Sequence, residues 1–146
     1  MVTSSSVNHV TSGASHLDTM TPRKLQTTLM ACTPWTPDLL PGFEQSTLSG
    51  LAAPEGLVDT VLVRRRCASV SSRAVLYIHG YVDYFFQMHL ADFYNAAGLH
   101  FYALDLRRHG RAMRPHQHPN FTTNIDEYMQ DVDAAIAVLC KHEQID

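Results

Sequence analysis

The stretch that decides the fold is AVLYIHG, residues 74–80, in which five apolar residues lead directly into a His-Gly pair. A run that is apolar at every position is typical of a strand buried on both faces of a sheet. Residues 99–106 are a second predicted buried strand, and the run from Phe101 to Arg111 ends in charged residues. The sequence therefore predicts two buried strands that each deliver polar residues at their carboxyl end.

The segment between these two strands has the spacing of a helix. Its apolar residues recur on one helical face: Phe86, Leu90, Phe93, Tyr94 and Ala97. Gly98 is suited to end the helix. Strand, helix and strand of this size predict a parallel βαβ unit.

An antiparallel hairpin is expected before this unit. Residues 43–48 and 57–63 are prone to form strands, and they flank the turn sequence Ala53-Pro54-Glu55-Gly56. Strands so close in sequence can pair only in the antiparallel direction. The arginines at 64–66 then fit a solvated strand end.

The last predicted helix has apolar residues at alternating spacings of four and three: Ile125, Met129, Val132, Ile136 and Leu139. Acidic residues occupy the other face, and Asn124 with Glu127 resembles a capping box. A coiled coil would need more heptads, so packing of the apolar stripe on a sheet is the better interpretation.

Composition narrows the class of protein. The 146 residues suffice for one domain, and a net charge of −3 argues against nucleic acid or an anionic membrane as the main partner. The cysteines, three in number, are far apart and lack a Cys-x-x-Cys pair, so neither a disulfide framework nor a zinc ribbon is indicated. No apolar run reaches the length of a membrane span, and no secretory signal is recognisable. A cytoplasmic location is expected.

Two segments of the sequence are judged by composition and spacing alone: the N-terminal 36 residues and the histidine-rich loop near residue 116. Residues 1–36 are rich in Ser, Thr and His without apolar periodicity, which predicts a disordered segment. His116-x-His118, with His109 nearby, supplies two metal ligands at best, so a solvated loop is the better interpretation. We expect neither a metal nor a cofactor.

This order of elements resembles the first half of the α/β-hydrolase fold, in the branch of monoacylglycerol lipases, lysophospholipases and serine aminopeptidase-like enzymes. The resemblance covers roughly residues 40–146. It rests on a strand that ends in His79-Gly80-Tyr81, a helix, a strand that ends in Asp105-x-Arg107-x-x-Gly110, and a second helix, in this order. It implies that residues 37–146 are the N-terminal half of such a domain, with an incomplete sheet. The family pattern Asp-x-x-Gly-x-Gly-x-Ser is only partly kept, since Arg108 and Ala112 replace a Gly and the Ser.

The resemblance implies roles for the loop residues. The backbone N–H of Tyr81 would be an oxyanion donor, Gly80 would let the backbone approach the substrate, and His79 would brace the loop. Asp105 would fix neighbouring backbone or pair with Arg107 or Arg108. The aromatic residues nearby fit either core packing or the wall of an acyl pocket: Tyr81, Tyr84, Phe85 and Phe86.

No catalytic residue is expected within the 146 residues. A nucleophile elbow needs Gly-x-Ser-x-Gly, and the nearest imitation, at residues 13–17, has Leu in place of the second Gly. The resemblance thus implies a full-length serine hydrolase of carboxylic esters or lipids, of which this chain alone is inactive. An inactive binding protein is the alternative, and a nucleotide-binding domain with Asp105 on a ribose ranks last. The strand at 74–78 would be left as an exposed edge, so the isolated chain is expected to self-associate.

Overall fold

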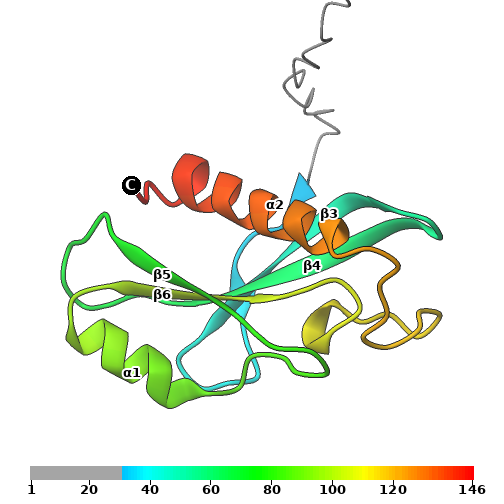
Figure 1. Ribbon diagram of the computed structural model, residues 1–146. Helices are drawn as coiled ribbons and strands as arrows, with labels where there is room; N and C mark the ends of the chain where they lie inside the picture. Colours follow the sequence, from blue (N-terminus) through cyan, green and yellow to red (C-terminus); the bar gives the residue numbers. More distant parts are fainter. Residues whose placement is uncertain (1–30) are drawn as a thin grey trace, which may run out of the picture.

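Residues 31–146 are described by a computed structural model with one mixed sheet of six strands and two α-helices (Figure 1). The strands are β1 (Ala31–Cys32), β2 (Thr36–Pro37), β3 (Glu44–Ala53), β4 (Gly56–Arg65), β5 (Ala74–Ile78) and β6 (His100–Asp105). The helices are α1 (Met88–Ala96) and α2 (Asp126–His142), and a 3-10 turn spans Gly110–Ala112. The protein is thus of the mixed α/β class.

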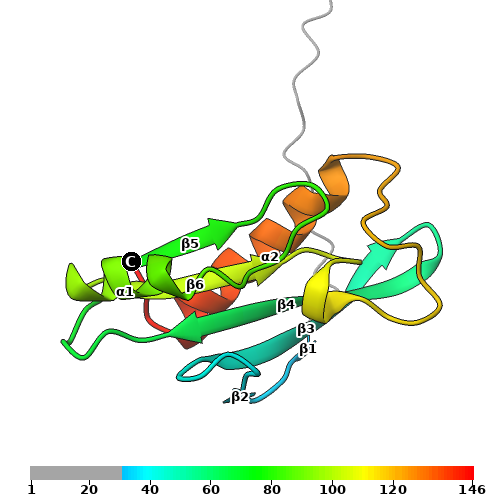
Figure 2. The ribbon, with the colours of Figure 1, turned by 90° about the horizontal axis from the view of Figure 1, so that it is seen from below.

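The strands lie in the order β1-β3-β4-β6-β5, with β2 also paired to β3 (Figure 2). β3 and β4 form an antiparallel hairpin around Pro54-Glu55, where the turn was predicted, and β4 is antiparallel to β6. β5 pairs with β6 in parallel. Most neighbouring strands are therefore antiparallel, and β5 is an edge strand among the described residues.

The sheet begins earlier in the sequence than predicted. Ala31 pairs with Ser49 and Thr36 with Gln45, so residues 31–36, expected to be disordered, extend the sheet at its β3 side. The remainder of the predicted disordered segment, residues 1–30, lies outside the described residues.

Two apolar cores lie on opposite faces of the sheet, and β6 contributes to both because all six of its residues are buried. Tyr102 and Leu104 pack on the α2 side, whereas Phe101 and Ala103 pack on the α1 side. This alternation is the period of a strand, and it fixes which face each helix covers.

The predicted stripe of α1 is wrong in part. Phe86 and Phe93 are exposed, and Phe85 is completely buried instead. The cause is that the carboxylate of Asp105 accepts the N–H of Phe85 at 3.0 Å, which holds this stretch as a loop and delays the helix to Met88. Leu90 and Tyr94 do pack on the core as predicted.

The predicted stripe of α2 is wrong in part, although Val132 and Leu139 do pack on the core as predicted. Ile125, Met129 and Ile136 are exposed, whereas Glu127 and Asp131, assigned to the solvent face, are buried. The acids turn inward because arginines at the end of β6 bind them. The predicted capping box does not form: the residue that caps α2 is Ile125, which makes no side-chain hydrogen bond. Asn124 accepts the N–H of Asp126 at 3.0 Å through its side chain, and the Glu127 carboxylate binds Arg108 instead.

The arginines at the end of β4 are not a free, solvated strand end. Arg64 and Arg66 both donate to the buried carboxylate of Glu143, just beyond α2. The hydroxyl of Tyr102 (2.8 Å) and the indole N–H of Trp35 (2.9 Å) donate to the same group. Burial raises the pKa of Glu143, but these hydrogen bonds outweigh it and hold the pKa below its ordinary value of 4.5.

Glu143→Ala is expected to lower the free energy of unfolding by about 2 kcal/mol, since it leaves several donors without their acceptor. Glu44→Ala is the matched control, because Glu44 binds the same Arg64 from an exposed position and contributes about 0.5 kcal/mol or less. Urea titrations measure both. Equal effects would contradict the role of Glu143.

The same carboxylate predicts a pH dependence. Because the folded-state pKa of Glu143 is lowered, its stabilisation is complete above the unfolded pKa and is lost as the pH falls through the folded value. Unfolding midpoints measured from pH 7 down to acid should therefore fall below about pH 4.5, and less so in Glu143→Ala. Parallel curves for the two proteins would contradict this.

Candidate functional site

The carboxyl ends of β5 and β6 bring the predicted site residues together. The Nε2 atom of His79 accepts the N–H of Leu106 at 3.1 Å, which places the ring proton on Nδ1. Nδ1 lies 2.7 Å from the carbonyl of Gly80 and donates to it. His79 therefore joins the loop after β5 to the end of β6, and both of its nitrogens are used in that contact.

A second imidazole lies beside it. The rings of His79 and His109 are 4.8 Å apart, and Nδ1 of His109 donates to the carbonyl of Arg107 at 2.8 Å. Burial lowers the pKa of His109, which favours the neutral ring. The sequence analysis considered His109 only as a residue near the histidines at 116 and 118. It did not predict that His109 lies beside His79.

Asp105 is a fully buried organiser of backbone. One carboxylate oxygen accepts the N–H of Phe85, and the other accepts the N–H (3.0 Å) and the guanidinium (2.9 Å) of Arg111. Its expected pairing with Arg107 or Arg108 is wrong, since Arg111 takes that place. Because both oxygens are engaged inside the protein, Asp105 is not presented to a nucleotide ribose, as that alternative would require.

Arg111 is another residue of the site that the sequence did not indicate. Its guanidinium also binds the buried carboxylate of Asp38 (2.6 Å) and the carbonyl of Phe85 (3.0 Å). Gly110, with φ +42°, lies directly before it. No local pattern could reveal a pair whose members are separated by most of the domain.

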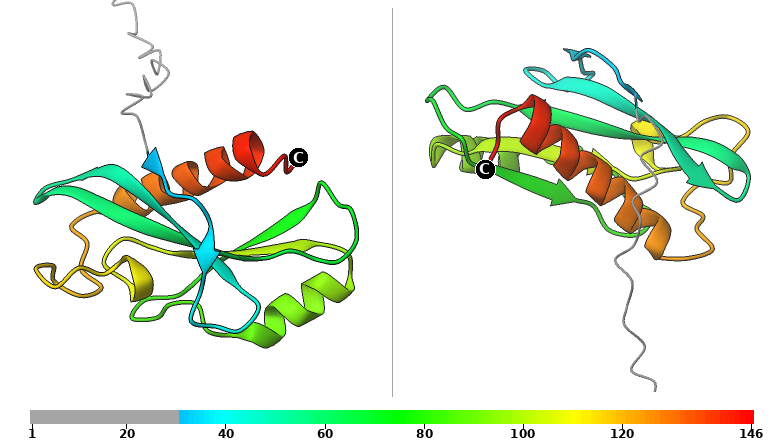
Figure 3. Two further views of the ribbon diagram at one scale, coloured as in Figure 1. Left: turned by 180° about the vertical axis from the view of Figure 1, so that it is seen from behind. Right: turned by 90° about the horizontal axis from the view of Figure 1, so that it is seen from above.

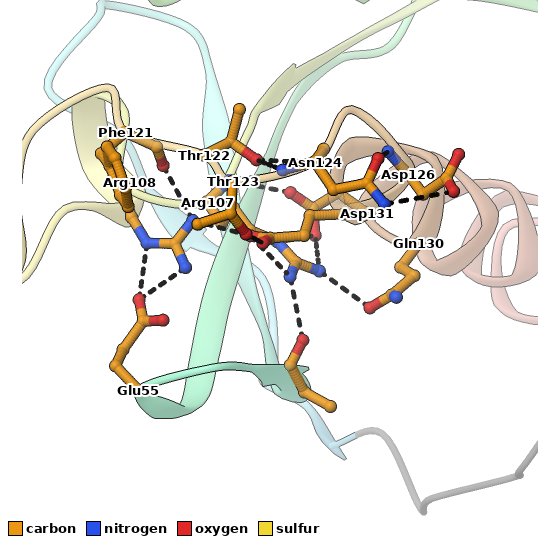
Figure 4. A network of polar contacts seen from close by, with 12 residues as sticks. Glu55, Arg107, Arg108, Phe121, Thr122, Thr123, Asn124, Asp126, Gln130 and Asp131 are labelled. Atoms are coloured by element: carbon orange, nitrogen blue, oxygen red, sulfur yellow. Dashed lines mark hydrogen bonds and ion pairs between the residues drawn. The ribbon is translucent and has the colours of Figure 1, made fainter.

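Arg107 and Arg108 serve α2 rather than the loop after β5. Arg107 is fully buried and binds Asp131 through its backbone N–H (2.9 Å) and its guanidinium (2.6 Å), and Figure 4 shows this network. Burial raises the pKa of Asp131, and the hydrogen bonds from Arg107 oppose that shift. Arg108 binds Glu55 and Glu127. Arg107 therefore fastens the end of β6 to α2, and its role in supporting the loop after β5 stays a prediction.

The loop after Gly80 is open to solvent. Tyr81 is 81% exposed, and a Cβ built on Gly80 would meet no atom within 4 Å. Val82 has φ +56°, a left-handed conformation that is strained for a β-branched residue. Of the aromatic residues considered for an acyl pocket, Phe85 belongs to the core, while the rings of Tyr84 and Phe86 lie tilted against each other with their centroids 5.7 Å apart.

Val82→Gly is expected to raise the free energy of unfolding by about 1 kcal/mol, because glycine adopts positive φ without a steric penalty. The matched control is Val70→Gly, since Val70 is fully exposed and has no positive φ. Thermal melts of both variants measure the difference. Destabilisation by Val82→Gly equal to that of the control would show that the loop is unstrained.

The histidine-rich loop provides no metal site within residues 31–146, because no three potential ligands come together there. His116 and His118 line an open depression of about 430 Å³ beside Arg108. The Gly13-Ala14-Ser15 imitation of a nucleophile elbow lies outside the described residues. Among the described helices, none is long and apolar enough to span a membrane.

Comparisons with known proteins found little. Neither a family model nor a curated protein matches the sequence. One solved structure that is similar is the PEG-bound complex of a cold-adapted esterase from an Arctic intertidal metagenomic library, with 15% identity and a TM-score of 0.43. The aligned part covers 75% of this chain and 49% of that esterase, so the chain spans about half of its length.

Proposed function

We propose that residues 37–146 are the N-terminal half of an α/β-hydrolase domain, and that the full-length protein hydrolyses carboxylic esters by a Ser-His-Asp mechanism. The nucleophile, the acid and the base of that triad would lie in polypeptide that follows Asp146. The substrate would be a small ester or a lipid, and the enzyme would act in the cytoplasm without a metal or cofactor.

The observation that carries this proposal is the geometry of the His79-Gly80-Tyr81 loop. Both ring nitrogens of His79 form hydrogen bonds that hold the loop to the end of β6. Gly80 leaves open space on the outer side of the loop. A rigid loop with room above it is what a preorganised oxyanion donor needs, and the Tyr81 N–H is the donor that we propose.

The loop after β6 supports the family resemblance at a position where the sequence departs from it. Arg108 stands where the family pattern has Gly, and it adopts φ +62°. A left-handed conformation costs a non-glycine residue about 1 kcal/mol. The backbone therefore keeps the shape that favours glycine, and the ion pairs of Arg108 with Glu55 and Glu127 offset the strain.

In the proposed mechanism, the serine attacks the ester carbonyl while the histidine takes its proton. The carbonyl oxygen becomes an oxyanion beside the Tyr81 N–H. The hydrogen bond from this N–H stabilises the oxyanion more than it stabilises the carbonyl of the bound substrate. The histidine then returns the proton to the alcohol that leaves, and water repeats the sequence to release the acid. Within this chain, His79, Asp105 and Gly110 contribute by holding the two loops in place.

The test uses the natural full-length protein, assayed on p-nitrophenyl esters and labelled with a fluorophosphonate. Tyr81→Pro removes the backbone N–H and should lower kcat by about 10²–10³, the usual effect of losing one oxyanion donor. Tyr81→Phe keeps the N–H and should have no effect on kcat. Gly80→Ala should fold normally yet lower kcat/KM, because its methyl group enters the open space.

Two outcomes would contradict the proposal at different points. A natural protein that neither hydrolyses esters nor reacts with the fluorophosphonate is not a serine hydrolase, which leaves the inactive binding protein. An active enzyme that is indifferent to both Tyr81→Pro and Gly80→Ala would place its oxyanion hole elsewhere.

A further inference from the structure

The loop that follows β5 is anchored at both of its ends. At its start, the ring of His79 binds the N–H of Leu106 at 3.1 Å. At its end, both backbone groups of Phe85 are bound, because its N–H donates to Asp105 and its carbonyl accepts from Arg111, each at 3.0 Å. Phe85 is also completely buried. The short stretch between the two anchors therefore takes its position from both.

The stretch between the anchors carries the backbone strain of the loop. Val82 has a φ of +56°, which is unfavourable for a β-branched residue. Such a conformation persists only where the surrounding structure enforces it. Tyr81, whose N–H is the proposed oxyanion donor, lies directly before Val82 in the chain. If either anchor loosens, the strain is released by a backbone rotation next to Tyr81, and this rotation shifts the N–H.

The second anchor depends on a residue that is far away in the sequence. Asp38 lies in the loop after β2, and its side chain is completely buried. Its two carboxylate oxygens accept from the guanidinium of Arg111 at 2.6 and 2.9 Å, and one of them also accepts the N–H of Leu40 at 2.8 Å. In the left view of Figure 3 this loop (cyan) lies below the strands, on the same side of the sheet as α1 and the 3-10 turn (yellow).

The guanidinium of Arg111 is shared by two buried carboxylates. Asp38 binds its Nε and Nη2 atoms, whereas Asp105 and the carbonyl of Phe85 bind Nη1. Burial raises the pKa of Asp38, but the hydrogen bonds from Arg111 and from the N–H of Leu40 outweigh it and hold the pKa below its ordinary value of 3.8. Asp38 is therefore ionised near neutral pH. Without it, only Nη1 would be held, and the guanidinium could turn away from the carbonyl of Phe85.

We propose that Asp38 is a positioning residue, which sets the place of the Tyr81 N–H through the guanidinium of Arg111. The effect passes from the carboxylate to the guanidinium, then to the carbonyl of Phe85, and back along the strained loop. That the Tyr81 N–H is an oxyanion donor rests on the proposed function. That Asp38 sets its position does not, and the two statements are tested separately.

The first measurement uses the natural full-length protein labelled with ¹⁵N-tyrosine, in which Tyr81→Phe identifies the amide signal of Tyr81 by removing it. Asp38→Asn keeps the oxygen that accepts the N–H of Leu40. It replaces the other oxygen, which faces the Nε of Arg111, with an NH₂ group. Two donors would then face each other. The Tyr81 signal should shift or broaden in this variant.

The second measurement is the hydrolysis of p-nitrophenyl esters. Asp38→Asn should lower kcat by about tenfold and change KM by less than about twofold, because a misplaced donor weakens binding of the transition state more than binding of the substrate. Glu143→Ala is the matched control, since it removes a buried carboxylate that binds two arginines and contacts neither anchor. It should lower the thermal midpoint but leave kcat and the Tyr81 signal unchanged.

A second variant reaches the same anchor from its other member. Arg111→Lys keeps a cation beside Asp105, but an ammonium group cannot bind two carboxylates and the carbonyl of Phe85 with the geometry of a guanidinium. It should move the Tyr81 signal as Asp38→Asn does. This variant decides the question if Asp38→Asn does not fold.

The outcomes separate this proposal from that of the hydrolase. A Tyr81 signal that is the same in the variants and in the unmodified protein would overturn the positioning role of Asp38. A shift that Glu143→Ala also produces would overturn it too, since lost stability would then be the cause. In an active enzyme, an unchanged kcat in Asp38→Asn would overturn its role in catalysis. A protein without esterase activity contradicts the hydrolase proposal, and the amide signal alone then decides whether Asp38 positions the loop.

Discussion

Arg107→Ala is expected to destabilise the fold by about 3–5 kcal/mol, the usual cost of removing one partner from a buried ion pair. Both Arg107 and Asp131 have fully buried side chains, and the guanidinium also donates to the carbonyl of Ala52 at 3.0 Å. Alanine would leave a carboxylate without its counter-ion inside the protein. Since small domains are stable by only about 5–15 kcal/mol, much of the fold's stability would be lost.

The design of this experiment includes a rescue and a control. Arg107→Met combined with Asp131→Leu removes both charges and should recover most of the loss, because burial of the ions is itself costly. Arg114→Ala breaks an Arg–Asp pair with Asp59 in which both side chains are partly exposed, and should cost less than about 1 kcal/mol. Equal losses for Arg107 and Arg114 in urea titrations would contradict the structural role of the buried pair.

Gly110→Ala is expected to cost about 3 kcal/mol or more, because a Cβ there has no space. The added atom would lie 2.5 Å from the Cβ of Tyr84 and 2.6 Å from a carboxylate oxygen of Asp105, at φ +42°. Asp105 is held by its hydrogen bonds with Phe85 and Arg111, and the Cβ of Tyr84 can move only with its backbone.

Two other glycines separate the causes of that loss. Gly56→Ala has an unfavourable φ of +123° but open space, and should cost about 1 kcal/mol. Gly80→Ala has neither problem and should change stability by less than about 0.5 kcal/mol. A Gly110→Ala variant as stable as Gly80→Ala, judged by thermal melting, would show that the two loops do not pack as described.

The strand at 74–78 and the β3–β4 hairpin could be predicted because the local sequence signals there agree with one another. The apolar run at 74–78 became β5, and the Pro54-Glu55 turn closed its hairpin because strand propensity and turn chemistry agreed there. The orientation of α2 could not be predicted from its apolar spacing. Arg107 and Arg108 are buried cations that need counter-ions, and their ion pairs turn Asp131 and Glu127 inward. The cause lies at the end of β6 and not in the helix sequence.

The sequence indicated which residues lie at the candidate site, but not which side chains they bind. The sequence indicated His79, Gly80 and Asp105 because they follow buried strands, where α/β sheets place their ligands. It missed Arg111 and Asp38, whose pairing depends on how the chain returns across the sheet. It also gave no sign that Val82 would carry the strained backbone of the loop.

The most direct test of the hydrolase proposal is the coding sequence downstream of the codon for Asp146. We predict a reading frame that continues into an apolar strand and Gly-x-Ser-x-Gly within about 25 residues, because the elbow follows the next strand in this fold. A stop codon directly after Asp146 in the verified transcript, with no separate frame that encodes an elbow, would contradict the proposal and leave this chain as a binding protein.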